Sequence, residues 1–120
     1  MIDVQNYLKQ FHYCDNLYGY KRRQTRPVDI GGIAVGGNNP IRIQSMTISN
    51  TRDTEASVNE VMQLADAGCD YVRLTAPSKR EAENLQNIKD QLRSRGYTIP
   101  LIADIHFTPN AAEIAAQIVD

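Results

Sequence analysis

Residues 71–81 read YVRLTAPSKRE and join a short strand to the start of a helix. Val72 and Leu74 alternate with more polar residues, as side chains do along a strand. Ser78 and Glu81 then have the spacing of a capping box, which marks a helix N-terminus. The predicted helix has one apolar face, made of Ala82, Leu85, Ile88 and Leu92, and it ends at Gly96. The stretch therefore predicts one strand–helix unit.

The same pattern occurs three times, and strand patterns begin near Ile41, Tyr71 and Leu101, a spacing of about 30 residues that is typical of a βα unit. The first helix carries Val58, Val61, Met62 and Ala65 at helical spacing; Thr54, or Ser57 with Glu60, is its start signal and Gly68 its stop. The third helix opens with Thr108-Pro109 and is expected to run through Ile114 and Ile118 to the last residue. Repeated strand–helix units predict a parallel sheet with right-handed crossovers.

The predicted fold class is α/β, and the three units are expected to be the first three of a TIM (β/α)8 barrel. Such a barrel needs eight units and about 250 residues. The chain has 120 residues. We therefore expect it to be a fragment in which the barrel is incomplete.

The first 26 residues differ in composition from the rest and are interpreted as an N-terminal arm. Four of the six tyrosines lie here, namely Tyr7, Tyr13, Tyr18 and Tyr20. A short helix is expected near residues 4–10. Residues 28–30 and 33–35 form two apolar runs joined by Gly31-Gly32, a pair that favours a tight β-hairpin turn. The domain division is thus an arm, 1–26, and the N-terminal portion of a barrel, 27–120.

The composition and net charge of the chain indicate which classes of binding partner to expect. With 42% hydrophobic and 22% charged residues the chain is an ordinary globular sequence. Its net charge of -1 gives no broad positive field, and the one basic cluster, residues 21–26, contains no stacking aromatic side chain, so no nucleic-acid partner is expected. The sequence has neither a long apolar run nor a signal peptide, so we expect no membrane association and a cytoplasmic location. Cys14 and Cys69 are far apart and are expected to be free thiols.

Polar residues interrupt all three predicted strands on one face. Parallel strands covered on both sides normally read as continuous apolar runs. Here Gln44, Arg73, Asp104 and His106 share one parity and are expected towards the carboxyl ends of their strands, where α/β folds bind ligands. Arg42 has the same parity but is expected lower, at the bottom rim. The pattern predicts one wall of a ligand pocket.

The residue types favour a phosphorylated polyhydroxy ligand. Arg73 offers a two-pronged donor for phosphate oxygens, and His106 can transfer a proton near neutral pH. A purely structural alternative is that Asp104 pairs with Arg73 or with His106 and binds no ligand. A metal-dependent hydrolase is a further alternative, but a catalytic metal needs about three protein ligands and only Asp104 and His106 are visible.

Four segments resemble the hydroxymethylbutenyl diphosphate synthase family of the methylerythritol phosphate pathway of isoprenoid biosynthesis. They are RRQTR (22–26), PIRIQSMT (40–47), VRLT (72–75) and IPLIADIHF (99–107). The resemblance extends over residues 22–120, and residues 47–53 with the long second helix are more similar to the larger, three-domain variety of the family.

The resemblance implies a parent iron–sulfur oxidoreductase that reductively opens 2-C-methyl-D-erythritol 2,4-cyclodiphosphate to 4-hydroxy-3-methylbut-2-enyl diphosphate. It implies two electrons delivered through a [4Fe-4S] cluster, ferredoxin or flavodoxin as donor, and a homodimer in which a C-terminal domain closes over the partner's barrel.

The same resemblance assigns site residues. Gln44, Arg73, Asp104 and His106 are expected to contact the substrate, and Ser45, Met46 and Thr75 to line the pocket. No residue of this chain is expected to be a cluster ligand or a catalytic group, and the fragment alone is expected to be inactive.

Two other functions remain open from the sequence. One is another phosphate- or pterin-binding barrel similar to dihydropteroate synthase. The other is a non-catalytic interaction module built on the tyrosine-rich arm, which leaves the polar strand ends unexplained.

Overall fold

The computed structural model describes residues 1, 3–9 and 18–120, with only the backbone of 7–9. Cys14, Tyr13 and the side chain of Tyr7 therefore lie outside the described parts. The elements are α1 (Val4–Lys9), β1 (Val28–Ile30), β2 (Ile33–Val35), β3 (Gln44–Met46), α2 (Thr54–Asp66), β4 (Tyr71–Ala76), α3 (Lys79–Ser94), β5 (Leu101–Ile105) and α4 (Pro109–Ala115). The short N-terminal helix matches its prediction as far as the chain is described.

The predicted parallel sheet is confirmed, with strand order β3-β4-β5. Ser45 lies opposite Val72 and Val72 opposite Leu101, so these residues share one face. The other face carries Met46 and Arg73, which are likewise in register. The sheet is open and has the arrangement of a partial TIM barrel.

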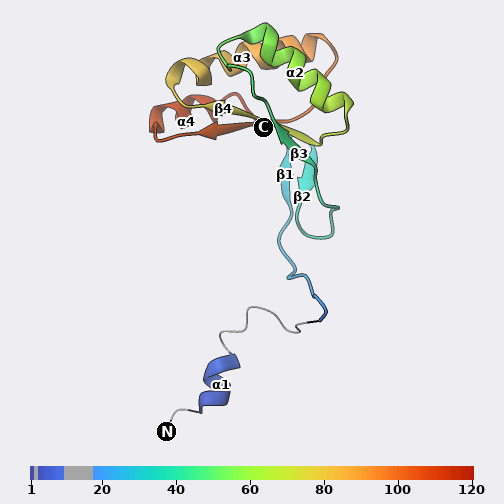
Figure 1. Cartoon of the computed structure of the whole chain (residues 1–120), viewed down its shortest axis with the longest axis vertical. Helices are drawn as coiled ribbons and strands as arrows, with labels where there is room; N and C mark the ends of the chain where they lie inside the picture. Colours follow the sequence, from blue (N-terminus) through green and yellow to red (C-terminus); the bar gives the residue numbers. More distant parts are fainter. Residues whose placement is uncertain (2, 10–17) are drawn as a thin grey trace.

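Helices α2, α3 and α4 pack on one face of the sheet (Figure 1). Every second residue of a strand points to this face, and most of the residues at these positions are apolar. Val72, Leu74 and Leu101 are fully buried there, and the helices add Val58, Val61, Leu85, Ile88 and Leu92. Burying such side chains contributes roughly 1.5–3 kcal/mol each, so this layer supplies most of the driving force for folding. The opposite face, which would line the interior of a barrel, carries the polar residues.

The β1–β2 hairpin lies at the end of the sheet where the strands begin (Figure 1). Gly31 and Gly32 have φ of 57° and 89°, as the predicted tight turn requires. The hydroxyl of Tyr71, the first residue of β4, donates to the Ile33 carbonyl at 2.5 Å. Arg42 Nε donates to the Ala34 carbonyl at 2.7 Å, which places Arg42 at the bottom rim as expected. The hairpin therefore covers the amino-terminal ends of the strands, a position we call the floor.

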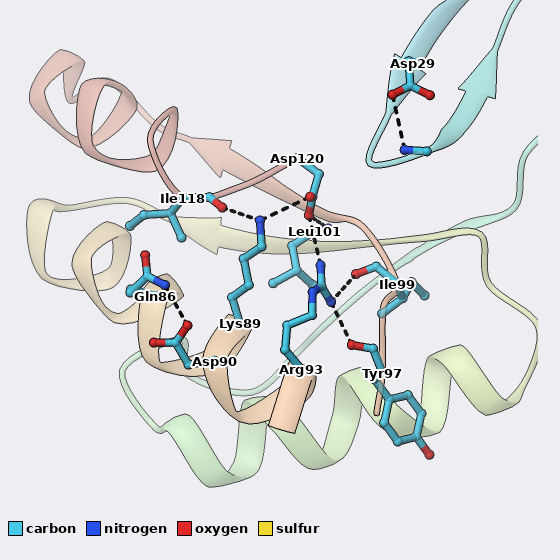
Figure 2. Close-up of polar contacts among 11 residues, drawn as sticks. Asp29, Gln86, Lys89, Asp90, Arg93, Tyr97, Ile99, Leu101, Ile118 and Asp120 are labelled. Carbon is cyan, nitrogen blue, oxygen red and sulfur yellow. Dashed lines mark hydrogen bonds and ion pairs between the residues drawn. The ribbon is translucent and has the colours of Figure 1, made fainter. Parts of the chain in front are cut away.

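Asp120 returns the chain to the floor beside β5 (Figure 2). Its carboxylate accepts the Leu101 backbone N–H at 3.1 Å, and Lys89 Nζ and Arg93 Nη2 lie at 3.2 and 3.4 Å. The Asp120 N–H in turn donates to the Leu101 carbonyl at 3.3 Å. These contacts tie the end of the third unit to the first residue of β5.

Two helix boundaries and one capping contact differ from the predictions. Helix α2 is capped by Asp53, whose side chain accepts the Ala56 N–H, and neither Thr54 nor Ser57 is its cap. Ser78 is the N-cap of α3, but its hydroxyl contacts the Glu81 carboxylate and makes no hydrogen bond to the backbone. Helix α4 ends at Ala115, short of the last residue to which it was expected to run, and the chain then turns so that Asp120 reaches β5.

The first strand of the sheet is also shorter than predicted. Residues 41–43 lie outside β3, although the Ile43 carbonyl accepts the Tyr71 N–H at 3.2 Å, and the Ile41 and Ile43 side chains are exposed. Among the described residues β3 pairs only with β4, so this edge has one neighbour. The carboxylate of Asp70 accepts the Ile43 N–H at 2.7 Å and thereby fixes where pairing begins.

Candidate functional site

Three of the predicted site residues meet at the carboxyl end of the sheet. Arg73 Nη2 lies 2.8 Å from Asp104 Oδ2, and His106 Nε2 lies 3.1 Å from Asp104 Oδ1. The Asp104 side chain is 15% exposed, while those of Arg73 and His106 are 40% and 48% exposed. We call these residues the Arg73–Asp104–His106 cluster. Asp104 thus orients two groups that can each still reach a ligand.

The protonation of Asp104 follows from these contacts. The hydrogen bond with His106 lowers the pKa of Asp104 most, and the hydrogen bond and charge of Arg73 lower it further. Partial burial acts in the opposite direction but is outweighed. The carboxylate is therefore ionised across the physiological range and accepts hydrogen bonds from both neighbours.

Strand register explains why the cluster forms. Arg73 lies opposite Ile102 and Thr75 opposite Asp104, so all four side chains share the face away from the helices. Asp104 lies two residues beyond Ile102, the residue opposite Arg73 in the ladder. The long side chain of Arg73 spans this offset along the strand. The sequence predicts the shared face, because parity is a local property. It left open whether Asp104 pairs with Arg73 or with His106, and in the structure Asp104 contacts both.

Two further predicted residues lie on the same face. Met46 is opposite Arg73 in the ladder and is 38% exposed. Thr75 is partly buried, and its backbone carbonyl accepts a hydrogen bond from the Thr51 hydroxyl at 2.7 Å. Both positions border the cluster, although their contact with a substrate stays a prediction.

Gln44 and Ser45 are placed differently. Gln44 is the first residue of β3 and lies opposite Tyr71, the first residue of β4. The expectation that Gln44 sits towards the carboxyl end of its strand is therefore wrong; it is on the correct face but near the floor. Ser45 is opposite Val72 and faces the helices. Neither residue joins the cluster in the described structure, and their proposed substrate contacts stay predictions.

The loop after β3 is held in place by helix α2. The Glu60 carboxylate accepts the backbone N–H groups of Ile48 and Ser49, both at 2.9 Å. Asn84 of α3 donates to the Thr51 carbonyl at 2.7 Å. In the sequence Glu60 was interpreted only as part of a helix start, because a glutamate inside a helix carries no local signal for such a contact.

The loop after β5 contains an unusual backbone conformation. Phe107 has φ of 53°, the only positive φ outside glycine among the described residues, and its side chain is fully exposed. For an L-residue this conformation costs roughly 1–2 kcal/mol. The next residue, Thr108, donates its hydroxyl to the Pro77 carbonyl at 3.0 Å. Phe107 belongs to the IPLIADIHF segment that resembles the family, but it was not among the predicted site residues, and no local pattern predicts its backbone conformation.

A cavity of about 730 Å³ lies at the opposite end of the sheet. It is lined by the floor hairpin and by Arg22, Arg23, Arg42, Gln44, Tyr71 and Ile102. Ligand sites in barrels lie at the carboxyl ends of the strands, and their interiors are filled by layers of side chains. The cavity is therefore the unfilled lower interior of the partial barrel, and the cluster is the better candidate for a site.

A bound metal is not supported by the described residues. Across residues 1, 3–9 and 18–120, no three His, Cys, Asp or Glu side chains are grouped so as to hold a metal ion. Cys69 is a free, partly buried thiol. The side chains described here thus do not fit an iron–sulfur cluster.

In the same part of the chain, no helix has the length and apolar character to cross a membrane.

Comparison with known proteins identifies the family. A family model described as the GcpE TIM-barrel domain matches residues 25–120. A protein of Akkermansia muciniphila is 55% identical over 111 residues, which are 92% of this chain and 19% of the relative. Relatives from Bacteroides thetaiotaomicron and Leptospira interrogans are 55% and 50% identical over 102 and 110 residues, which are 85% and 92% of this chain and 17% of each relative.

All three relatives carry the name 4-hydroxy-3-methylbut-2-en-1-yl diphosphate synthase (flavodoxin). The chain spans less than a fifth of the length of these curated relatives. The family match covers the parallel sheet, the floor hairpin and the Arg73–Asp104–His106 cluster. The chain belongs to the GcpE TIM-barrel family.

Proposed function

We propose that this chain forms the first wall of the substrate-binding barrel of a 4-hydroxy-3-methylbut-2-enyl diphosphate synthase. In this proposal the parent enzyme opens 2-C-methyl-D-erythritol 2,4-cyclodiphosphate by a two-electron reduction. The observation that carries the proposal is the Arg73–Asp104–His106 cluster at the carboxyl ends of parallel strands. Names and identities of the relatives support the choice of substrate.

The cluster has the chemistry that such a substrate needs. A guanidinium binds phosphate oxygens through two parallel N–H groups, and Asp104 holds the guanidinium of Arg73 in one orientation. His106 is oriented by the same carboxylate, so its imidazole can exchange a hydrogen bond or a proton with a bound ligand. A diphosphate carries several negative charges, and one arginine does not neutralise them. The remaining cations must come from other parts of the enzyme.

The cofactor and the electron donor belong to the parent enzyme in this proposal. A [4Fe-4S] cluster would supply the electrons one at a time, and its ligands would lie outside the residues described here. Flavodoxin is the donor that the relatives' names specify, and ferredoxin is the alternative.

The assembly and location are part of the same proposal. A match to less than a fifth of each relative leaves ample length for further domains, which supports the larger three-domain variety. We propose a homodimer in which another domain closes over the barrel, and a cytoplasmic location. We further propose that residues 1–26 are an arm separate from the barrel part, residues 27–120.

The test is turnover by the full-length polypeptide that contains these residues. After anaerobic cluster reconstitution, it should convert the cyclodiphosphate to the product with reduced flavodoxin. Arg73→Ala should lower kcat/KM on the order of 10- to 100-fold, since hydrogen bonds to charged groups contribute about 1.5–3 kcal/mol. Arg80→Ala is the matched control, because Arg80 is an exposed arginine on α3. Absence of turnover by the unmodified enzyme would disprove the function, and unchanged kinetics of Arg73→Ala would disprove the assigned site.

A further inference from the structure

Phe107 combines two features that work against stability. Its backbone lies in the left-handed region, where glycine or asparagine is favoured over a bulky side chain. Its ring is fully exposed, so burial within this chain does not offset that cost. Strained residues of this kind gather at functional sites, where the strain fixes a group in a useful position.

The position of Phe107 relates it directly to the candidate site. It follows His106, whose Nε2 lies 3.1 Å from Asp104 Oδ1, and it precedes Thr108, whose hydroxyl is bonded to the Pro77 carbonyl. The residue is therefore held between two anchored neighbours. Consecutive Cα atoms are about 3.8 Å apart, so the backbone of Phe107 lies directly beside the cluster.

Apolar side chains are also exposed on the other side of the cluster. Met46 at the end of β3 is 38% exposed, and Ile48 in the following loop is 96% exposed. Arg73 lies on β4, between β3 and β5. The carboxyl edge of the sheet thus presents a polar centre with apolar groups on both flanks, an arrangement suited to a ligand with phosphate and hydrocarbon parts.

We propose that Phe107 is a substrate-binding residue whose ring packs on the carbon skeleton of the cyclodiphosphate while the Arg73–Asp104–His106 cluster holds its polar groups. This inference rests on the proposed function, since it takes its substrate from there. The left-handed backbone at Phe107 is the means by which the ring is kept at the edge of the site.

The experiment compares two variants that keep the backbone and remove the ring with one that keeps the ring. Phe107→Gly and Phe107→Asn tolerate the left-handed conformation, and Phe107→Tyr retains an aromatic side chain. All are made in the full-length enzyme. The measurements are thermal unfolding, kcat and KM, and calorimetric binding of the cyclodiphosphate and of inorganic pyrophosphate, a probe without carbon.

Phe107→Gly should unfold at the same or a higher temperature than the unmodified enzyme and bind the cyclodiphosphate at least about 10-fold more weakly, as expected for loss of a buried aromatic contact. Phe107→Asn should weaken this binding similarly, whereas Phe107→Tyr should bind normally. Pyrophosphate affinity should be unchanged in all three, because the polar cluster is intact.

Each other result overturns the inference. A lower unfolding temperature for Phe107→Gly would mean that the ring packs on protein. Equal loss of pyrophosphate affinity would mean that Phe107 acts only by placing His106, and unchanged cyclodiphosphate affinity would mean that the ring makes no contact. Failure of the proposed function is distinguishable, because then the unmodified enzyme itself would not bind or turn over the cyclodiphosphate.

Discussion

The carboxylate of Asp104 on β5 lies 2.8 Å from the guanidinium of Arg73 on the neighbouring strand β4. Such a pair was one of the structural alternatives that the sequence left open. A solvent-exposed ion pair contributes little to stability, because water and salt weaken it. Here the Arg73 side chain is 40% exposed, so a ligand can still reach it. The pair orients a group that can act on something else.

Replacement of Asp104 by asparagine should therefore impair function more than folding. The amide keeps the size of the side chain but loses the charge, and only its oxygen can still accept from Arg73 or His106. We expect kcat/KM of the full-length enzyme to fall on the order of 10- to 100-fold. The urea midpoint should change little. Asp90→Asn on the exposed face of α3 is the control. If Asp104→Asn kept full activity, the assignment of the Asp104 carboxylate to the substrate site would be wrong.

The loop after β3 should lose stability in acid through Glu60. Burial raises the pKa of Glu60, but the hydrogen bonds from Ile48 and Ser49 outweigh it, so the pKa lies below the ordinary value of 4.5. Because the folded-state pKa is lowered, the contribution of Glu60 is fully present above 4.5 and is lost as the pH falls through the lowered pKa.

Urea unfolding of this chain at pH 7 and about pH 3.5 tests this contribution. Glu60→Gln should destabilise the chain at pH 7, because its amide N–H₂ would face a backbone N–H, and the difference from the unmodified chain should shrink in acid. Glu83→Gln, which removes an exposed carboxylate from α3, should show no such pattern. A constant difference between Glu60→Gln and the unmodified chain at both pH values would contradict the assignment.

Two buried threonines should respond oppositely to the same substitution. The Thr51 hydroxyl donates to the Thr75 carbonyl, whereas the Thr47 hydroxyl is buried and has no partner among the described residues. Thr51→Val should cost about 1–2 kcal/mol of unfolding free energy, because the carbonyl loses its donor. Thr47→Val should be neutral or stabilising by up to about 1 kcal/mol, since it removes an unsatisfied polar group. Chemical denaturation of both variants checks this, and equal effects would refute it.

The sequence predicted which face each strand residue occupies but not its height in the sheet. Parity along a strand is local, and it correctly grouped Arg73, Asp104 and His106. Height depends on register, which is set by contacts distant in the chain, such as the Asp70 carboxylate on the Ile43 N–H. For that reason Gln44 was expected near the carboxyl end and lies near the floor.

Capping and loop contacts were harder to predict for the same reason. Ser78 was correctly predicted as the N-cap of α3, because that choice depends on adjacent residues. The true cap of α2, Asp53, competed with other polar residues at similar spacing. The contact of Glu60 with the loop after β3 and the left-handed Phe107 arise from how the units pack, and no local pattern specifies them.

The floor hairpin gives the sharpest test of packing, through two adjacent glycines. Both have positive φ, so alanine is strained at either position. A Cβ on Gly31 would also meet the side chain of Pro100 at 2.9 Å, whereas a Cβ on Gly32 would meet nothing within 4 Å. We expect Gly32→Ala to lower the free energy of unfolding by about 1 kcal/mol and Gly31→Ala to lower it by about 2–4 kcal/mol. The larger effect is expected because only the Gly31→Ala side chain would force the hairpin away from Pro100 and β5.

Urea unfolding of this chain measures both costs, and hydrogen exchange at the Leu101 amide, next to Pro100, reports on the contact itself. Exchange at Leu101 should be faster in Gly31→Ala than in Gly32→Ala. The backbone strain is common to the two variants, so the difference between them isolates the packing of the hairpin on the sheet. Equal destabilisation would mean that the hairpin does not rest on Pro100 in solution, and the floor would then not be closed by residues 28–35.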